Sequence, residues 1–216
     1  QRIALMFLAA MVVLIFQGPW VQVGIIAISA GLGILFFKPQ IIAEHDILPS
    51  LVNKKIAVTF LIVFLSVLLF LPLVAKVVSI DIIQVLDSFY RSGSLVFGGG
   101  HVVLPLLKAE FVPNGLVSKD VFLAGYGAAQ AVPGPLFTFS AFLGSSLQTD
   151  LSPILVGLLA LLAIFSPSFL LIVGVMPFWE NLRQKLGVQS ALIGVNSAVV
   201  GLLLAALYSP VWTSAI

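Results

Sequence analysis

The sequence contains no cysteine and few charged residues. Its 216 residues include two His and only 8% Asp, Glu, Lys and Arg. Without cysteine, a disulfide framework, a thiolate metal site and a cysteine nucleophile are all excluded. A soluble domain carries about 25% charged residues. A chain with 8% cannot cover a soluble fold with a surface that water solvates.

Apolar residues are abundant instead. They make up 61% of the chain, and the mean hydropathy is +1.22. This composition excludes a disordered chain, which needs low hydrophobicity and high charge. It predicts an all-α integral membrane protein, because a helix satisfies its own backbone hydrogen bonds in lipid. We expect residues 1–216 to form one transmembrane domain, a helical bundle that passes several times through the cell (inner) membrane.

The apolar runs predict the positions of the membrane helices. We expect helices over residues 3–16, 21–37, 56–75, 154–178 and 190–208. The polar residues of 76–97 share one face at helical spacing, which predicts an amphipathic helix that begins at the interface. The ten Lys and Arg are spread over the loops, where they orient the chain in the membrane, and we expect no nucleic-acid partner.

The middle third, residues 88–149, departs from a plain bundle. Gly98-Gly99-Gly100 and Pro133-Gly134-Pro135 interrupt apolar sequence, and short helices are predicted at 101–111, 121–132 and 136–147. Non-helical backbone at membrane depth persists only where it is buried in protein or lines a wet cavity. In transporters, paired broken helices mark the substrate site. We therefore expect broken or re-entrant half-helices around a substrate site.

The chemistry near both interruptions favours an anion. Half-helices that start near His101 and Leu136 would aim free N–H groups and positive dipole ends at their ligand. Basic and hydroxyl side chains are expected there, including a stripe of Thr138, Ala141, Ser145 and Gln148, whereas Glu110 is expected to point away. The predicted substrate-binding residues are Gly98, Gly99, Gly100, His101, Pro133, Gly134, Pro135, Thr138, Arg91, Lys108 and Gln130.

The interruptions and the histidine also have structural interpretations. The triple glycine is a potential packing device, since small residues let membrane helices approach closely. The Pro133-Gly134-Pro135 segment also fits a simple kink or loop. His101 alternatively caps its half-helix.

The remaining side chains have alternatives as well. Lys108 suits an interface, where it would snorkel. Arg91 has the i, i+4 spacing to pair with Asp87 on a wetted face. Glu110 fits an interfacial acid better than a proton carrier. Gln130 and Tyr126 lie one turn apart and either line a path or form hydrogen bonds between helices.

Two motifs in order resemble a known family. Residues 97–107 read FGGGHVVLPLL, residues 110–112 read EFV, and residues 122–139 read FLAGYGAAQAVPGPLFTF. This stretch closely resembles the chromate ion transporter family, in which a motif of this kind lies in the second of two homologous halves. The close match covers about residues 90–147, and the flanking spans agree mainly in hydropathy.

The resemblance implies a function that the composition alone does not. It implies a proton-motive-force-dependent exporter of chromate that shares features with sulfate transport. It also implies that the chain is the C-terminal half of a longer protein or one subunit of a two-chain version, which agrees with a first residue, Gln1, that is not Met. The expected partners are an inorganic oxyanion (chromate or sulfate), the homologous other half or a second subunit, and the lipid bilayer. No enzyme activity, catalytic residue, metal site or cofactor is predicted.

Other functions remain open at this point. The chain could be a non-catalytic assembly subunit whose interruptions pack against a partner, or a channel. An intramembrane hydrolase is disfavoured, since the sequence has no Gly-x-Ser-x-Gly elbow and no His-Glu-x-x-His run.

Overall fold

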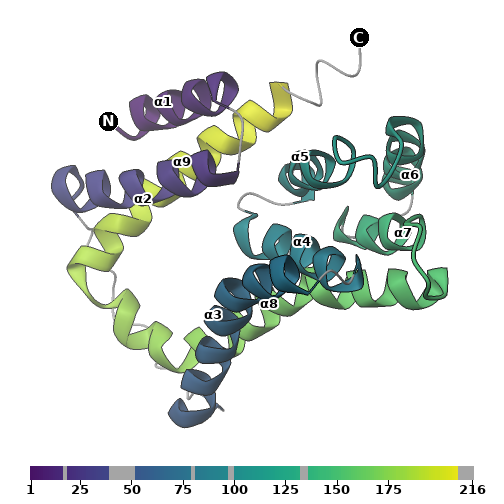
Figure 1. Ribbon diagram of the computed structural model, residues 1–216. Coiled ribbons are helices and arrows are strands. Elements are labelled where there is room, and N and C mark those ends of the chain that lie inside the picture. Colours follow the sequence, from purple (N-terminus) through teal and green to yellow (C-terminus); the bar gives the residue numbers. More distant parts are fainter. Residues whose placement is uncertain (17–18, 39–51, 79–80, 97–99, 132–135, 209–216) are drawn as a thin grey trace. The chain divides into compact units, whose positions relative to one another are not determined.

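A computed structural model of the chain describes residues 1–16, 19–38, 52–78, 81–96, 100–131 and 136–208. Every regular element within these ranges is a helix, which confirms the all-α prediction. The elements are α1 (Arg2–Ile15), α2 (Pro19–Phe36), α3 (Lys54–Val77), α4 (Asp81–Leu95), α5 (Gly100–Phe111), α6 (Lys119–Ala131), the 3-10 helix η1 (Leu136–Thr138), α7 (Phe139–Ser145), α8 (Pro153–Arg183) and α9 (Leu186–Ala206) (Figure 1).

Among the described helices, three are long and apolar enough to cross a membrane. They are Lys54–Val77, Pro153–Trp179 and Leu186–Ala205. Large apolar side chains such as Ile62 and Leu69 on α3 are exposed on the surface. A soluble protein rarely exposes so much contiguous apolar surface, whereas lipid solvates it. The chain is therefore an α-helical membrane protein.

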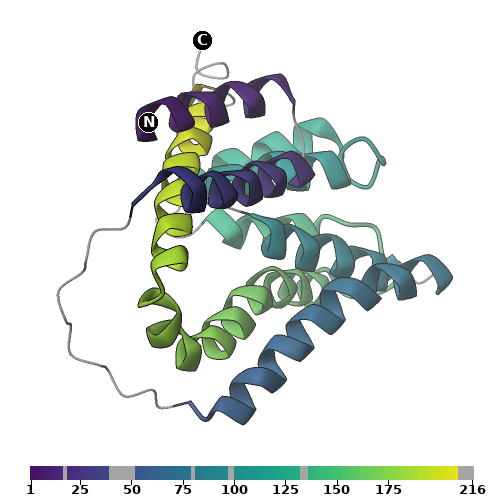
Figure 2. The same cartoon turned by 90° about the vertical axis from the view of Figure 1, so that its left-hand side faces the viewer.

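The chain divides into two compact units, and the first comprises residues 1–54 and 176–216. Within it, α9 packs against both α1 and α2, as Figures 1 and 2 show. Glycines allow this close packing: a Cβ on Gly194 would overlap the Ser29 carbonyl oxygen, and a Cβ on Gly201 would overlap that of Met6. Small residues at helix interfaces are the usual means of close packing in a membrane.

The second unit, residues 55–175, contains the middle third of the chain. Its core is rich in phenylalanine. The rings of Phe89 and Phe111 lie 4.8 Å apart between centroids, and Phe122 meets Phe139 edge-to-face at 5.0 Å. The buried residues of this core are Val85, Phe89, Val103, Leu104, Leu107, Phe111, Val117, Phe122, Phe139, Leu143, Leu147, Val156, Ala160 and Ile164.

Helix α4 is packed on several sides within this unit. Phe89 contacts Phe111 of α5, Tyr90 donates a hydrogen bond of 3.1 Å to the Phe64 carbonyl of α3, and Gly93 lies against the Ile164 carbonyl of α8. These three contacts surround α4 with other helices of the unit. The side chains of α4 are therefore held in place from more than one direction.

The last two helices are longer than the apolar pattern predicts. The sequence predicts spans at 154–178 and 190–208 with a loop between them, whereas α8 continues to Arg183 and α9 begins at Leu186. The loop predicted at 179–189 is confined to Gln184 and Lys185, because the polar residues on either side end the apolar run without ending the helices. Pro167 is fully buried and lies inside α8.

The hydrogen bond between Tyr90 and α3 gives a test of this packing. Tyr90→Phe removes the donor and leaves the Phe64 carbonyl without that bond, while the ring keeps its contacts. A typical intramolecular hydrogen bond contributes about 1 kcal/mol. We expect a modest fall in the thermal unfolding temperature of the purified protein in detergent. An unchanged unfolding temperature would show that this bond makes no net contribution.

Candidate functional site

Both predicted interruptions coincide with helix boundaries. Helix α4 ends at Leu95 and α5 begins at Gly100, while α6 ends at Ala131 and η1 begins at Leu136. The remaining predicted residues of the two interruptions lie outside the described residues; they are Gly98, Gly99, Pro133, Gly134 and Pro135.

The segments that follow the two interruptions meet. Helix α5 packs against η1, and η1 also contacts α6 and α7. Leu136 and Phe137 pack on the core cluster that contains Val103, Leu104 and Leu107 of α5. Within the described residues, the contact between α5 and η1 is therefore apolar. The two segments that follow the interruptions therefore lie side by side. The backbone predicted to bind the anion lies outside the described residues, and its role stays a prediction.

The other predicted site residues have different positions. Gly100 begins α5, and His101 follows it in the first turn. Lys108 and Thr138 are exposed. Gln130 is also exposed, and its Nε2 donates a hydrogen bond to the Tyr126 hydroxyl. That bond joins two residues of α6, whereas one of the two interpretations from the sequence was a hydrogen bond between helices. The other interpretation, that these residues line a path, stays a prediction.

A charge cluster links α4 to α5, and we define it as Asp87, Ser88, Arg91 and Glu110. Arg91 Nη2 lies 2.8 Å from Asp87 Oδ2 and 3.6 Å from Glu110 Oε2. Ser88 Oγ donates to the same Glu110 oxygen at 3.4 Å. The Arg91–Asp87 pair predicted from the i, i+4 spacing is confirmed. Asp87 is only 6% exposed, however, so its side chain does not lie on a wetted face.

The prediction that Glu110 points away from the basic groups was wrong. Its carboxylate faces α4, and it shares Arg91 with Asp87. The physical reason is the register of two helices: Phe111 docks on Phe89, which brings the preceding residue of α5 alongside α4. A helical-wheel argument on α5 alone cannot include this contact.

The ionisation of Asp87 reflects its burial. Helix α4 is not among the candidate membrane spans. Burial raises the pKa of the Asp87 carboxyl above its usual value; the Arg91 guanidinium opposes this rise, the Glu110 carboxylate adds to it, and Lys76 opposes it more weakly. Loss of hydration disfavours the charged form of a carboxyl group. Asp87 therefore takes up a proton more readily than a surface aspartate does.

Part of the predicted small and polar stripe serves helix packing. A Cβ on Gly157 of α8 would overlap the Ala141 carbonyl and touch Ser145. Gly144 packs against Val156 of the same helix. The side of α7 that carries Ala141 and Ser145 therefore packs against α8, and this packing accounts for their small size.

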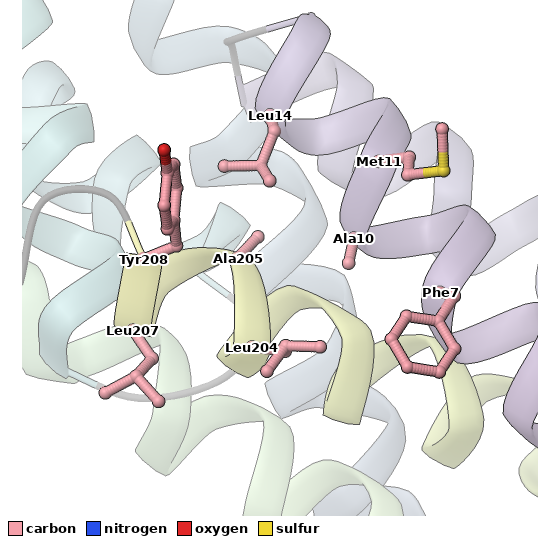
Figure 3. Close-up of a pocket in the computed structure, with 8 residues that line it drawn as sticks. All are labelled: Phe7, Ala10, Met11, Leu14, Leu204, Ala205, Leu207 and Tyr208. Carbon is pink, nitrogen blue, oxygen red and sulfur yellow. The ribbon is translucent and has the colours of Figure 1, made fainter. Parts of the chain in front are cut away.

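An apolar hollow of about 390 Å³ lies between α1 and α9 of the first unit (Figure 3). Apart from the Tyr208 hydroxyl, its walls are hydrocarbon and thioether. Among the described residues no charged group lines it, so these walls offer nothing to neutralise an oxyanion. The lining residues are Phe7, Ala10, Met11, Leu14, Leu204, Ala205, Leu207 and Tyr208, none of them predicted as a site residue.

Comparison with known proteins gives three informative relatives. The chain is 33% identical over 116 residues to the uncharacterized transporter YwrB of Bacillus subtilis, covering 53% of this chain and 56% of that protein. It is 26% identical over 110 residues to an uncharacterized transporter of Methanocaldococcus jannaschii, covering 50% and 26%. It is 24% identical over 123 residues to the chromate transport protein of Pseudomonas aeruginosa, covering 57% and 29%. The matched part thus spans little more than half of these relatives' length at most. No solved structure matches the chain.

The fold and these relatives define the class of the protein. Within the described residues the chain is an all-helical membrane protein with three candidate spans, and the relatives that it matches are named as transporters or as a transport protein. Residues 83–216, more than half of the chain, match the chromate transporter family. The chain belongs to the chromate transporter family. The matched region includes both interruptions and the whole charge cluster.

Proposed function

We propose that the protein takes part in secondary active transport of an inorganic oxyanion. Chromate is the substrate we favour, with sulfate as a related one, and the direction is export across the inner membrane. The proton or ion motive force drives the export. The observation that carries this proposal is the family match, which spans the two interrupted-helix segments.

The architecture around the interruptions supports the proposal. New helical segments begin at Gly100 and Leu136, and α5 packs against η1. Free N–H groups at helix starts can bind a tetrahedral oxyanion without a dedicated side chain for each oxygen. We propose that residues 88–149 form the substrate region and that Gly98–Gly100 and Pro133–Pro135 provide its backbone.

A second half completes the transport path in this proposal. The chain aligns with only 29% of the Pseudomonas aeruginosa chromate transport protein. We propose that a homologous half, in the same polypeptide or as a separate subunit, supplies the remainder. A second candidate function, a non-transporting assembly subunit, makes the opposite prediction: flux would survive when the interruptions of this chain are altered.

The experiment measures chromate uptake into everted membrane vesicles that carry the complete protein. We expect saturable uptake that sulfate and molybdate reduce and that collapses when the proton motive force is dissipated. Gly99→Leu and Pro135→Leu are each expected to lower uptake more than tenfold at unchanged protein level, because a bulky side chain would fill the space where backbone approaches the anion.

The matched control is Gly187→Leu, since a Cβ at this position meets open space. We expect near-normal uptake for that variant. Linear, non-saturating uptake would identify a channel. Normal uptake by both interruption variants would argue against the proposed site and favour the assembly role.

A further inference from the structure

The charge cluster has more negative than positive charge. Asp87, Glu110 and Arg91 together carry one net negative charge when all three are ionised. A single guanidinium nitrogen, Nη2, contacts both carboxylates. Nε of the same arginine is buried and has no hydrogen-bond partner among the described residues. Arg91 thus retains donor capacity on a group whose planar fork suits an oxyanion.

We propose that Asp87 is the proton-linked residue of the transport cycle: its protonation releases Arg91 to bind the oxyanion. This inference rests on the proposed function. Within the cluster, the Asp87 carboxylate accepts a hydrogen bond from Arg91, and the Glu110 carboxylate accepts a hydrogen bond from Ser88. When Arg91 turns to the anion, Glu110 keeps a donor, but Asp87 would become a buried, unpaired carboxylate. A buried carboxylate in that position takes up a proton instead.

The surroundings of Asp87 leave few other groups to carry this role. Arg91 lies on the same helix as Asp87, Glu110 faces Asp87 from α5, and Lys76 at the end of α3 acts on it more weakly than either. Lys108 of α5 is exposed, and residues 153–175 of α8 include no ionisable side chain. Asp87 is the more buried of the cluster's two carboxylates, with 8% of its side chain exposed against 34% for Glu110.

The coupling between proton binding at Asp87 and anion binding has a sign that an experiment can measure. Binding of a dianion places more negative charge near Asp87 and favours its proton, so anion and proton bind together. A dianion that moves with one proton still carries one net negative charge, and an inside-negative membrane potential drives that charge outward. Anion affinity should therefore fall by up to about tenfold per pH unit above the pKa of Asp87.

The test compares chromate uptake by vesicles of the complete wild-type protein and of Asp87→Asn over a series of pH values. Chromate itself binds a proton as the pH falls. Variant and wild type are therefore compared at the same pH, where the protonation of chromate is the same for both proteins. Because Asp87→Asn mimics the protonated residue, we expect its uptake to lose the wild-type pH dependence. Glu110→Gln should retain the dependence, and the exposed Asp150→Asn is the matched control.

A second measurement does not depend on any variant folding. Addition of chromate to the purified complete protein in weakly buffered detergent solution should withdraw about one proton per bound anion, beyond the protonation of chromate itself, as read by a pH indicator. Unaltered pH dependence in Asp87→Asn, or no such proton uptake, would overturn this inference and leave the proposed function standing. Absence of uptake by the wild type at every pH would overturn both.

Discussion

Gly93→Leu is expected to prevent α4 from packing against α8 and to abolish chromate uptake. A Cβ at Gly93 would overlap the carbonyl oxygen of Ile164 and crowd its Cα. These are backbone atoms of a helix, so no side-chain rotation relieves the overlap. Overpacking of a well-packed core typically costs about 1–3 kcal/mol, and a clash with rigid backbone lies at or above the upper end of that range.

The consequence extends beyond the contact itself. Helix α4 carries Asp87 and Arg91, and Phe89 holds it against α5. Moving α4 away from α8 would therefore displace the charge cluster together with part of the core. We expect a strong loss of monodisperse protein after detergent extraction and a loss of uptake of more than tenfold. Gly93→Ala should show a smaller loss of the same kind.

Gly31→Leu is the control for this variant. Gly31 also lies in the middle of a helix, but a Cβ there meets open space. We expect nearly normal extraction and stability. Equal damage from both substitutions would assign the effect to leucine in a helix rather than to the α4–α8 contact. A stable, active Gly93→Leu protein would show that α4 does not pack as closely on α8 as described.

Local sequence signals predicted the helix boundaries near the interruptions well. Glycine and proline alter the backbone conformation locally. The neighbouring residues in the sequence are therefore enough to predict that helical segments start at Gly100 and Leu136. The same holds for Gly115, whose φ of +70° lies in the turn between α5 and α6, next to Pro113 and Asn114. The all-α membrane class followed from composition alone.

The charge cluster could be predicted only in part, because it depends on packing between helices. The i, i+4 spacing of Asp87 and Arg91 indicated their pairing, but nothing in that spacing indicates burial. Asp87 is buried because α3, α5 and α8 all pack on α4, and Glu110 joins the cluster because Phe111 docks on Phe89. Contacts between distant segments leave no periodic signal in one sequence. For the same reason the stripe on α7 suggested a polar lining, whereas part of it packs on Gly157.

Arg91→Leu should separate the structural role of the arginine from its role in binding. Removing the guanidinium leaves two neighbouring carboxylates, one of them buried, without their shared cation. Breaking a buried ion pair costs about 3–5 kcal/mol. We expect the lower end of that range, because the Arg91 side chain is 33% exposed. The variant should unfold at a clearly lower temperature in detergent and show no chromate uptake.

The double variant Asp87→Leu/Arg91→Leu distinguishes the structural role of Arg91 from its role in anion binding. Replacing both partners of a buried pair by apolar residues is often neutral for stability. Glu110 keeps its charge in this variant, but its side chain is 34% exposed and it still accepts the hydrogen bond from Ser88. We therefore expect the unfolding temperature to return most of the way to the wild-type value while uptake stays absent. Arg91→Lys keeps the charge but loses the planar fork. We expect this variant to fold normally but to transport chromate poorly. Uptake restored along with stability in the double variant would show that Arg91 holds α4 and α5 together without binding the anion, and the oxyanion would then be bound by the helix starts alone.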